Sequence, residues 1–193
     1  DATSSKSVKP EICPIPCRCN CLYGMCNWRS RGIDRLVLYL VMAGDIIFPI
    51  EKQKELLAEL SKKYYATPGS VTSAMKNVAE ELNQILLERN RIASEKGRQG
   101  LGLFSQCVIR EDQIYLAQSG PLQACWIMEI GAQFLSTMEV STRGLGLVRS
   151  APVNFSQVSY QPNGTLIISG RSDPSWTQQT WASLQGQGPE GVR

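Results

Sequence analysis

The spacing of hydrophobic and polar positions changes from a helical to an extended pattern near residue 97. Residues 36–43 (LVLYLVMA) form the longest apolar run, which has the length of one buried strand. Residues 51–64 place leucines on one face and lysines and glutamates on the other, so a first helix is predicted there. A second helix is expected to extend to about Ser94, with Thr67 as its cap and Pro68 at its first position. Both apolar faces need a sheet, or each other, to cover them.

Beyond residue 97 the pattern predicts strands. Residues 103–127 read as a meander of two antiparallel strands and the start of a third, because apolar runs are separated by a charged turn and a Ser-Gly-Pro break. Residues 133–140 are a further predicted strand. Residues 153–160 alternate as a half-buried strand does, and a Gln-Pro-Asn-Gly turn leads to a last strand at 165–169. Two helices followed by antiparallel strands predict an α+β layer arrangement.

Composition and charge narrow the classes of partner. The 193 residues carry 20 Lys and Arg against 17 Asp and Glu, and a net charge of +3 gives no support for nucleic-acid binding. No run approaches the roughly 20 apolar residues of a spanning helix, so no membrane segment is expected in this chain. The N-terminus lacks the layout of a secretory signal, and few cysteines lie outside the N-terminal arm. These features favour the cytoplasm.

The chain contains no histidine. This excludes general acid–base chemistry by histidine, Ser-His-Asp and Cys-His nucleophile pairs, and every zinc site that uses histidine.

Five of the seven cysteines fall within residues 1–32, a segment that we interpret as a Cys-rich N-terminal arm. They are Cys13, Cys17, Cys19, Cys21 and Cys26. Thiolates at this density can hold zinc or an iron–sulfur cluster. The spacing differs from the C-x2-C of zinc knuckles, however, and in an extended segment alternation would place Cys17, Cys19 and Cys21 in a row on one face. Disulfides and an unpaired thiol-rich arm are the alternatives.

Several turn segments occur in a distinctive order along the chain. They are Val41-Met42-Ala43-Gly44, Gly100-Leu101-Gly102 after Asn90, Gly120-Pro121-Leu122-Gln123-Ala124-Cys125, Leu145-Gly146, and Gln161-Pro162-Asn163-Gly164 with residues 166–170. This order resembles the metal-dependent protein phosphatases (PPM, type 2C). Their corresponding segments include Val-Ala-Asp-Gly, Gly-Asp-Ser-Arg-Ala-Tyr, Leu-Gly, Pro-Gly-Asp and Leu-Leu-Cys-Ser-Asp-Gly. The similarity extends over residues 36–176.

The resemblance implies a fold and a division of the chain. The fold class is α+β, a four-layer α-β-β-α sandwich of antiparallel sheets that is incomplete at its C-terminus, because the family's final Asp-Asn strand is missing. Residues 33–184 would form the PPM-phosphatase-like domain, and residues 185–193 a polar tail. Without that strand a sheet edge would lie open, which invites pairing with another chain and suggests part of a longer chain or assembly.

The departures from the family concern its metal ligands. PPM enzymes hold two Mg²⁺ or Mn²⁺ ions with aspartates, and hard divalent ions require oxygen ligands. Ala43 and Gly170 stand where two of these aspartates are expected, and Pro121 replaces an acidic turn residue. The resemblance therefore implies a fold without its chemistry, with no catalytic or cofactor-binding residue and no cofactor expected. Asp45 and Asp173 are the candidates for displaced Mn²⁺ or Mg²⁺ ligands, although turn roles are favoured for both.

The leading hypothesis is a catalytically silent pseudophosphatase domain that acts in signalling as a protein-interaction or regulatory module and binds a protein partner. One alternative is a divergent Mn²⁺/Mg²⁺-dependent serine/threonine phosphatase, and another is a structural subunit of a larger assembly. Of the remaining chemical side chains, Asp34 is expected to be a solvated residue at the entry of a strand. Cys107, Cys125 and Trp126 are expected to be buried packing residues.

Overall fold

The computed structural model describes residues 33–46, 48–135, 143–170, 179–180 and 183–184. In chain order the elements are β1 (Arg35–Gly44), α1 (Ile50–Ala66), α2 (Val71–Ser94), β2 (Gly100–Arg110), β3 (Gln113–Ser119), β4 (Gln123–Ile127), β5 (Ala132–Phe134), β6 (Asn154–Ser159) and β7 (Thr165–Ser169). The predicted N-terminal arm and the predicted polar tail lie outside the described residues.

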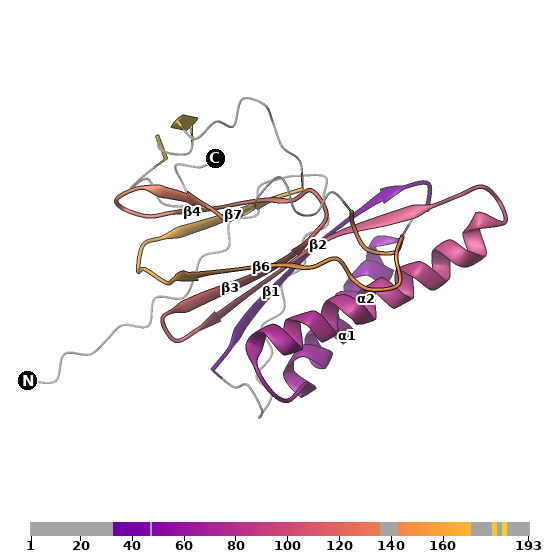
Figure 1. The fold of residues 1–193 in the computed structure, drawn as a ribbon, viewed down its shortest axis with the longest axis horizontal. Coiled ribbons are helices and arrows are strands. Elements are labelled where there is room, and N and C mark those ends of the chain that lie inside the picture. The colour runs from indigo at the N-terminus through magenta and orange to yellow at the C-terminus, as the bar shows by residue number, and fades with distance from the viewer. Residues whose placement is uncertain (1–32, 47, 136–142, 171–178, 181–182, 185–193) are drawn as a thin grey trace, which may run out of the picture.

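The strands form two antiparallel sheets. Sheet A has the order β1-β2-β3-β6, and sheet B has the order β5-β4-β7. Figure 1 shows α1 and α2 together on one side of sheet A, while β4 and β7 of sheet B lie on its other side. The predicted α+β sandwich of antiparallel sheets is confirmed, and the described residues form its helical layer and its two sheets.

Alternation along β1 explains why the helices pack on sheet A. Leu36, Leu38 and Leu40 are at most 2% exposed and point toward α1 and α2, whereas Val37 points toward sheet B. On the helical side Tyr64 and Leu82 are fully buried in the same core. Burying each large apolar side chain contributes about 1.5–3 kcal/mol, so this layer is a major source of stability.

The start of α2 differs from the prediction. Ser70, not Thr67, is the N-cap, and its hydroxyl accepts a hydrogen bond from the Ser73 N–H at 3.1 Å. Thr67 instead ends α1, where its hydroxyl donates to the Lys63 carbonyl at 2.7 Å. Gly69, with φ 95°, turns the chain between the two caps. Since serine and threonine both cap helices, the pattern alone did not distinguish the two positions.

The predicted meander is only partly correct. β2 and β3 pair as expected, but the third run, β4, belongs to sheet B, and β6 is the second neighbour of β3. The chain crosses between the sheets at Gly120, which has φ 94°, a conformation that favours glycine, and where a Cβ would lie 2.6 Å from Leu103 Cδ2. β5 is also shorter than the predicted strand at 133–140, and residues 136–142 lie outside the described ranges.

The two sheets enclose a second apolar core. Cys107 and Leu116 of sheet A pack there against Trp126 of sheet B, which confirms the expected packing role of Trp126. Burial raises the pKa of the Cys107 thiol to about 12 and that of the Cys125 thiol to about 11. Both cysteines therefore behave as small buried apolar groups, as predicted.

Neither α1 nor α2, nor any other helix in the part of the chain that the structure describes, has the length and hydrophobicity of a membrane-spanning helix.

Candidate functional site

The end of β1 is fixed by its main chain. Ala43 and Gly44 pair with Leu101 and Gly100 of β2. Gly44 has φ 93°, and a Cβ there would lie 2.4 Å from the Gln99 carbonyl oxygen, so only glycine fits. The strand therefore has to end in this conformation at this point.

Asp45 follows in an exposed bend. Its N–H donates to the Gln99 carbonyl at 2.8 Å, and its carbonyl accepts from Arg98 Nε at 3.2 Å and Arg98 Nη2 at 2.6 Å. These contacts use the main chain of Asp45 and match the turn role that the sequence favours. Its predicted role as a metal ligand stays a prediction. Asp173 and the five arm cysteines lie outside the described residues.

Gly170, which follows β7, lies against the inner face of β1. Its N–H donates to the Tyr39 hydroxyl at 3.1 Å. A Cβ at this position would lie 3.0 Å from both Tyr39 Oη and Val41 Cγ2, and 3.7 Å from Leu122 Cδ2. Since side chains alternate along a strand, Ala43 faces the same side as Tyr39 and Val41. The fold thus brings Ala43 and Gly170 to one end of the sandwich.

Two buried asparagines of α2 fix the loop at residues 143–150 beside this end. Asn90 Nδ2 donates to the carbonyls of Gly100 at 2.7 Å and Gly146 at 2.6 Å, and its Oδ1 accepts the Gly100 N–H at 2.7 Å. Asn83 Oδ1 accepts the Gly146 N–H at 2.8 Å, and its Nδ2 donates to the Val148 carbonyl at 2.9 Å. Sequence reasoning missed this role, although two asparagines seven residues apart on the apolar face of a helix were a usable signal.

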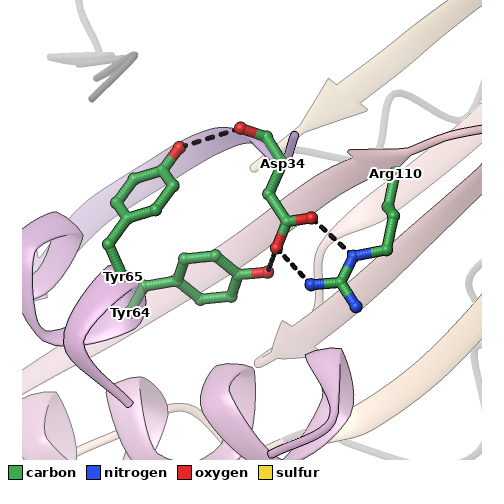
Figure 2. Close-up of polar contacts among 4 residues, drawn as sticks. All are labelled: Asp34, Tyr64, Tyr65 and Arg110. Atoms are coloured by element: carbon green, nitrogen blue, oxygen red, sulfur yellow. Dashed lines mark hydrogen bonds and ion pairs between the residues drawn. The ribbon is translucent and has the colours of Figure 1, made fainter. Parts of the chain in front are cut away.

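At the opposite end of β1 lies the only acidic side chain among the described residues that is buried, Asp34. Figure 2 shows its carboxylate between Arg110 and Tyr64. Arg110 donates to it from Nε at 2.5 Å and from Nη2 at 2.8 Å, and the Tyr64 hydroxyl donates at 2.7 Å. The Tyr65 hydroxyl donates to the Asp34 main-chain carbonyl at 3.2 Å.

The expectation that Asp34 is solvated was wrong, because the residue is only 4% exposed. Its hydrogen bond and charge raise the pKa of Arg110. Both carboxylate oxygens accept hydrogen bonds from Arg110, and Oδ2 also accepts one from the Tyr64 hydroxyl. The cluster joins the first residues of β1 to the end of α1 and the end of β2, so its role is structural.

Comparisons with known proteins show which solved structures share the fold of this chain. No protein-family model matches the sequence, and no curated protein matches it. The catalytic domain of the serine threonine protein phosphatase PstP, solved in complex with two manganese ions, matches with a TM-score of 0.61 at 10% identity, over 86% of this chain and 82% of that one. The S. agalactiae serine/threonine phosphatase matches with a TM-score of 0.55 at 13% identity, over 77% and 76%. The chain has the fold of the PPM-type phosphatases.

A bacterial serine phosphatase also shares this PPM fold, with a TM-score of 0.53 at 12% identity over 65% of this chain. The chain spans 62–64% of the length of the first three bacterial serine phosphatase structures, less than two thirds. At these identities the likeness concerns the fold.

The described residues do not fit the pair of divalent ions that the PPM fold implies. Such ions need several oxygen ligands, and Ala43 and Gly170 offer none from their side chains. Tyr39, Val41 and Leu122 pack around the position where a side chain at residue 170 would begin. Within the described ranges no three His, Cys, Asp or Glu side chains are grouped closely enough to hold a metal ion.

Proposed function

We propose that residues 33–184 form a catalytically silent PPM-phosphatase-like domain that acts as a protein-interaction or regulatory module. The observation that carries this proposal is that Ala43 and Gly170 lie at the same end of the sandwich, with Tyr39, Val41 and Leu122 around Gly170. The resemblance expects an aspartate at both positions. Neither present side chain can bind a divalent ion.

The chemistry of the fold supports the same conclusion. Phosphate ester hydrolysis by a metal-dependent phosphatase needs a metal-bound water whose pKa the ions lower. Without histidine the chain lacks the most common replacement for that base. The buried carboxylate of Asp34 is held by Arg110 at the other end of β1.

The rigid loop at residues 143–150 supports an interaction role. Asn83 and Asn90 hold its main chain from inside, while Leu147 is 38% exposed on its outer side. Loops held by a rigid scaffold are common binding elements, and an exposed apolar residue suits a protein partner. The cytoplasm remains the compartment that we predict.

An activity assay tests the proposal. The 193-residue chain is incubated with Mn²⁺ and either an aryl phosphate or a phosphopeptide, and we expect turnover no faster than the buffer control. The control variant is Asp112→Ala, which removes an exposed aspartate from the β2–β3 turn. Turnover above the buffer level would contradict the proposal if Asp45→Ala abolished it and Asp112→Ala did not. That result would establish the divergent Mn²⁺/Mg²⁺ phosphatase instead.

Native mass measurement separates the interaction module from an obligate structural subunit. A monodisperse monomer that unfolds cooperatively is expected for an independent module. A chain that is folded only as an oligomer would support the structural alternative.

A further inference from the structure

Four polar side chains form one row across sheet A. Tyr39 of β1 lies opposite Ser105 of β2, Ser105 lies opposite Gln118 of β3, and Gln118 lies opposite Asn154 of β6. Alternation places this row on the face toward sheet B, because Cys107, two residues from Ser105, belongs to the core between the sheets. We call these four residues the polar row.

On β1 and β2 the polar row is one residue wide along each strand, on the face toward sheet B. On one side the next inward positions are Val37, Cys107 and Leu116, and on the other they are Val41 and Leu103. On β1 and β2 the hydrogen-bonding groups therefore lie between apolar positions, whereas on β6 the residue opposite Leu116 is Ser156, whose hydroxyl donates to the Leu135 carbonyl at 2.6 Å. The residues of the polar row are far apart in the sequence, so the row becomes visible only through the strand register.

The middle of the polar row contains two unpaired groups. Ser105 is 0% exposed and Gln118 is 5% exposed, and among the residues that the structure describes neither Ser105 Oγ nor Gln118 Nε2 has a hydrogen-bond partner. Buried polar side chains are almost always paired in folded proteins, with protein groups or with ordered water. Two such groups on directly opposite residues point to a shared partner.

We propose that Ser105 Oγ and Gln118 Nε2 bind one ordered internal water molecule. The Gln118 amide donates to the water, and the water donates to Ser105 Oγ or accepts from it. Leu103, Cys107 and Leu116, which flank the pair, are at most 7% exposed, so the two groups are shielded from bulk solvent. Buried waters usually have two to four polar partners, and Ser105 and Gln118 supply two.

This site is distinct from the Ala43–Gly170 end, and it is independent of whether the protein is an enzyme. Tyr39 connects the two regions, because its hydroxyl accepts the Gly170 N–H from sheet B. The water contributes to stability by pairing groups that would otherwise be buried alone.

A crystal structure at a resolution that shows ordered solvent tests the proposal directly. We expect a solvent peak at about 2.7–3.2 Å from both Ser105 Oγ and Gln118 Nε2. A direct hydrogen bond between these two atoms without a solvent peak would overturn it. The same holds for a dry site in which both atoms stay unpaired.

Unfolding measurements give an independent test in solution. Ser105→Ala and Gln118→Leu each leave the water one partner short, so each is expected to raise the unfolding constant about tenfold or more. The double variant removes both partners and should raise it by clearly less than the product of the single effects. Gln157→Leu, at an exposed strand glutamine, is the control and should change it by no more than about twofold. Multiplicative single effects would contradict a shared water.

Discussion

The Asp34–Arg110 ion pair allows the most detailed stability prediction. The side chain of Asp34 is 0% exposed, while that of Arg110 is 27% exposed, so the two partners differ in their access to water. Deleting Asp34 leaves a guanidinium that water can reach. Deleting Arg110 removes the cation beside a buried carboxylate, which the Tyr64 hydroxyl still hydrogen-bonds. The two deletions should therefore have unequal effects.

The magnitudes follow from this asymmetry. Removing one partner of a buried pair lowers the free energy of unfolding by about 3–5 kcal/mol. Because Arg110 regains hydration, we expect Asp34→Ala to fall at the lower end, about 3 kcal/mol. Arg110→Ala removes the cation that compensates the buried carboxylate, and the loss should reach about 5 kcal/mol. Tyr64→Phe removes one hydrogen bond to a charged acceptor and should lower the free energy of unfolding by about 1.5–3 kcal/mol.

Urea unfolding followed by tryptophan fluorescence measures these values. Arg91→Ala, which removes a solvent-exposed pair with Glu88 on α2, is the control and should leave the unfolding midpoint unchanged. The reasoning is refuted if Arg110→Ala is no more destabilising than Asp34→Ala. It is also refuted if both variants match Arg91→Ala.

Three further predictions concern single residues. Burial raises the pKa of the Cys107 thiol from 9.0 to about 12, so the stability that the neutral thiol contributes is complete below pH 9 and is lost as the pH rises toward 12. In Cys107→Ala this loss of stability at alkaline pH should be smaller, as measured by urea unfolding at several pH values. Asn90→Ala leaves buried main-chain groups unpaired and should lower the free energy of unfolding by about 2–4 kcal/mol. The control Gln84→Ala, at an exposed site of α2, should change this free energy by less than about 1 kcal/mol, and equal losses in urea unfolding would contradict the prediction. Gly44→Ala places a side chain at a positive φ and against the Gln99 carbonyl oxygen. It should lower the melting temperature more than Gly131→Ala, because Gly131 has φ 101° but open space around an added Cβ. Equal shifts in calorimetry would show that the clash at Gly44 is relieved.

Much of the fold was accessible from the sequence because burial on one face leaves a periodic pattern. The prediction for β7 agrees with its bounds, Thr165–Ser169, and the second helix ends at the predicted Ser94. The sheet to which β4 belongs was not accessible, since an apolar run records that a strand is buried and not which neighbour buries it. The chain crosses at Gly120 with φ 94°, next to Leu103, a neighbour that is brought there only by folding.

The candidate site shows the same division. The sequence indicated that positions 43 and 170 lack the expected aspartates. That Ala43 and Gly170 lie at the same end of the sandwich depends on the packing of the two sheets. Tyr39 reads as one more apolar residue of a buried strand, yet its hydroxyl accepts the N–H of Gly170. Asp34 was taken for a surface residue because its partners Tyr64 and Arg110 lie 30 and 76 positions away. Long-range pairs of this kind leave no local signal.

The most direct test of the central claim is an anomalous-scattering map from crystals of the chain soaked in Mn²⁺. We predict no manganese peak between Ala43 and Gly170, because Tyr39, Val41 and Leu122 pack around Gly170 and no three His, Cys, Asp or Glu side chains of the described ranges are grouped to hold a metal ion. One or two ordered manganese peaks at this end, within coordination distance of Asp45 or another carboxylate, would contradict the account.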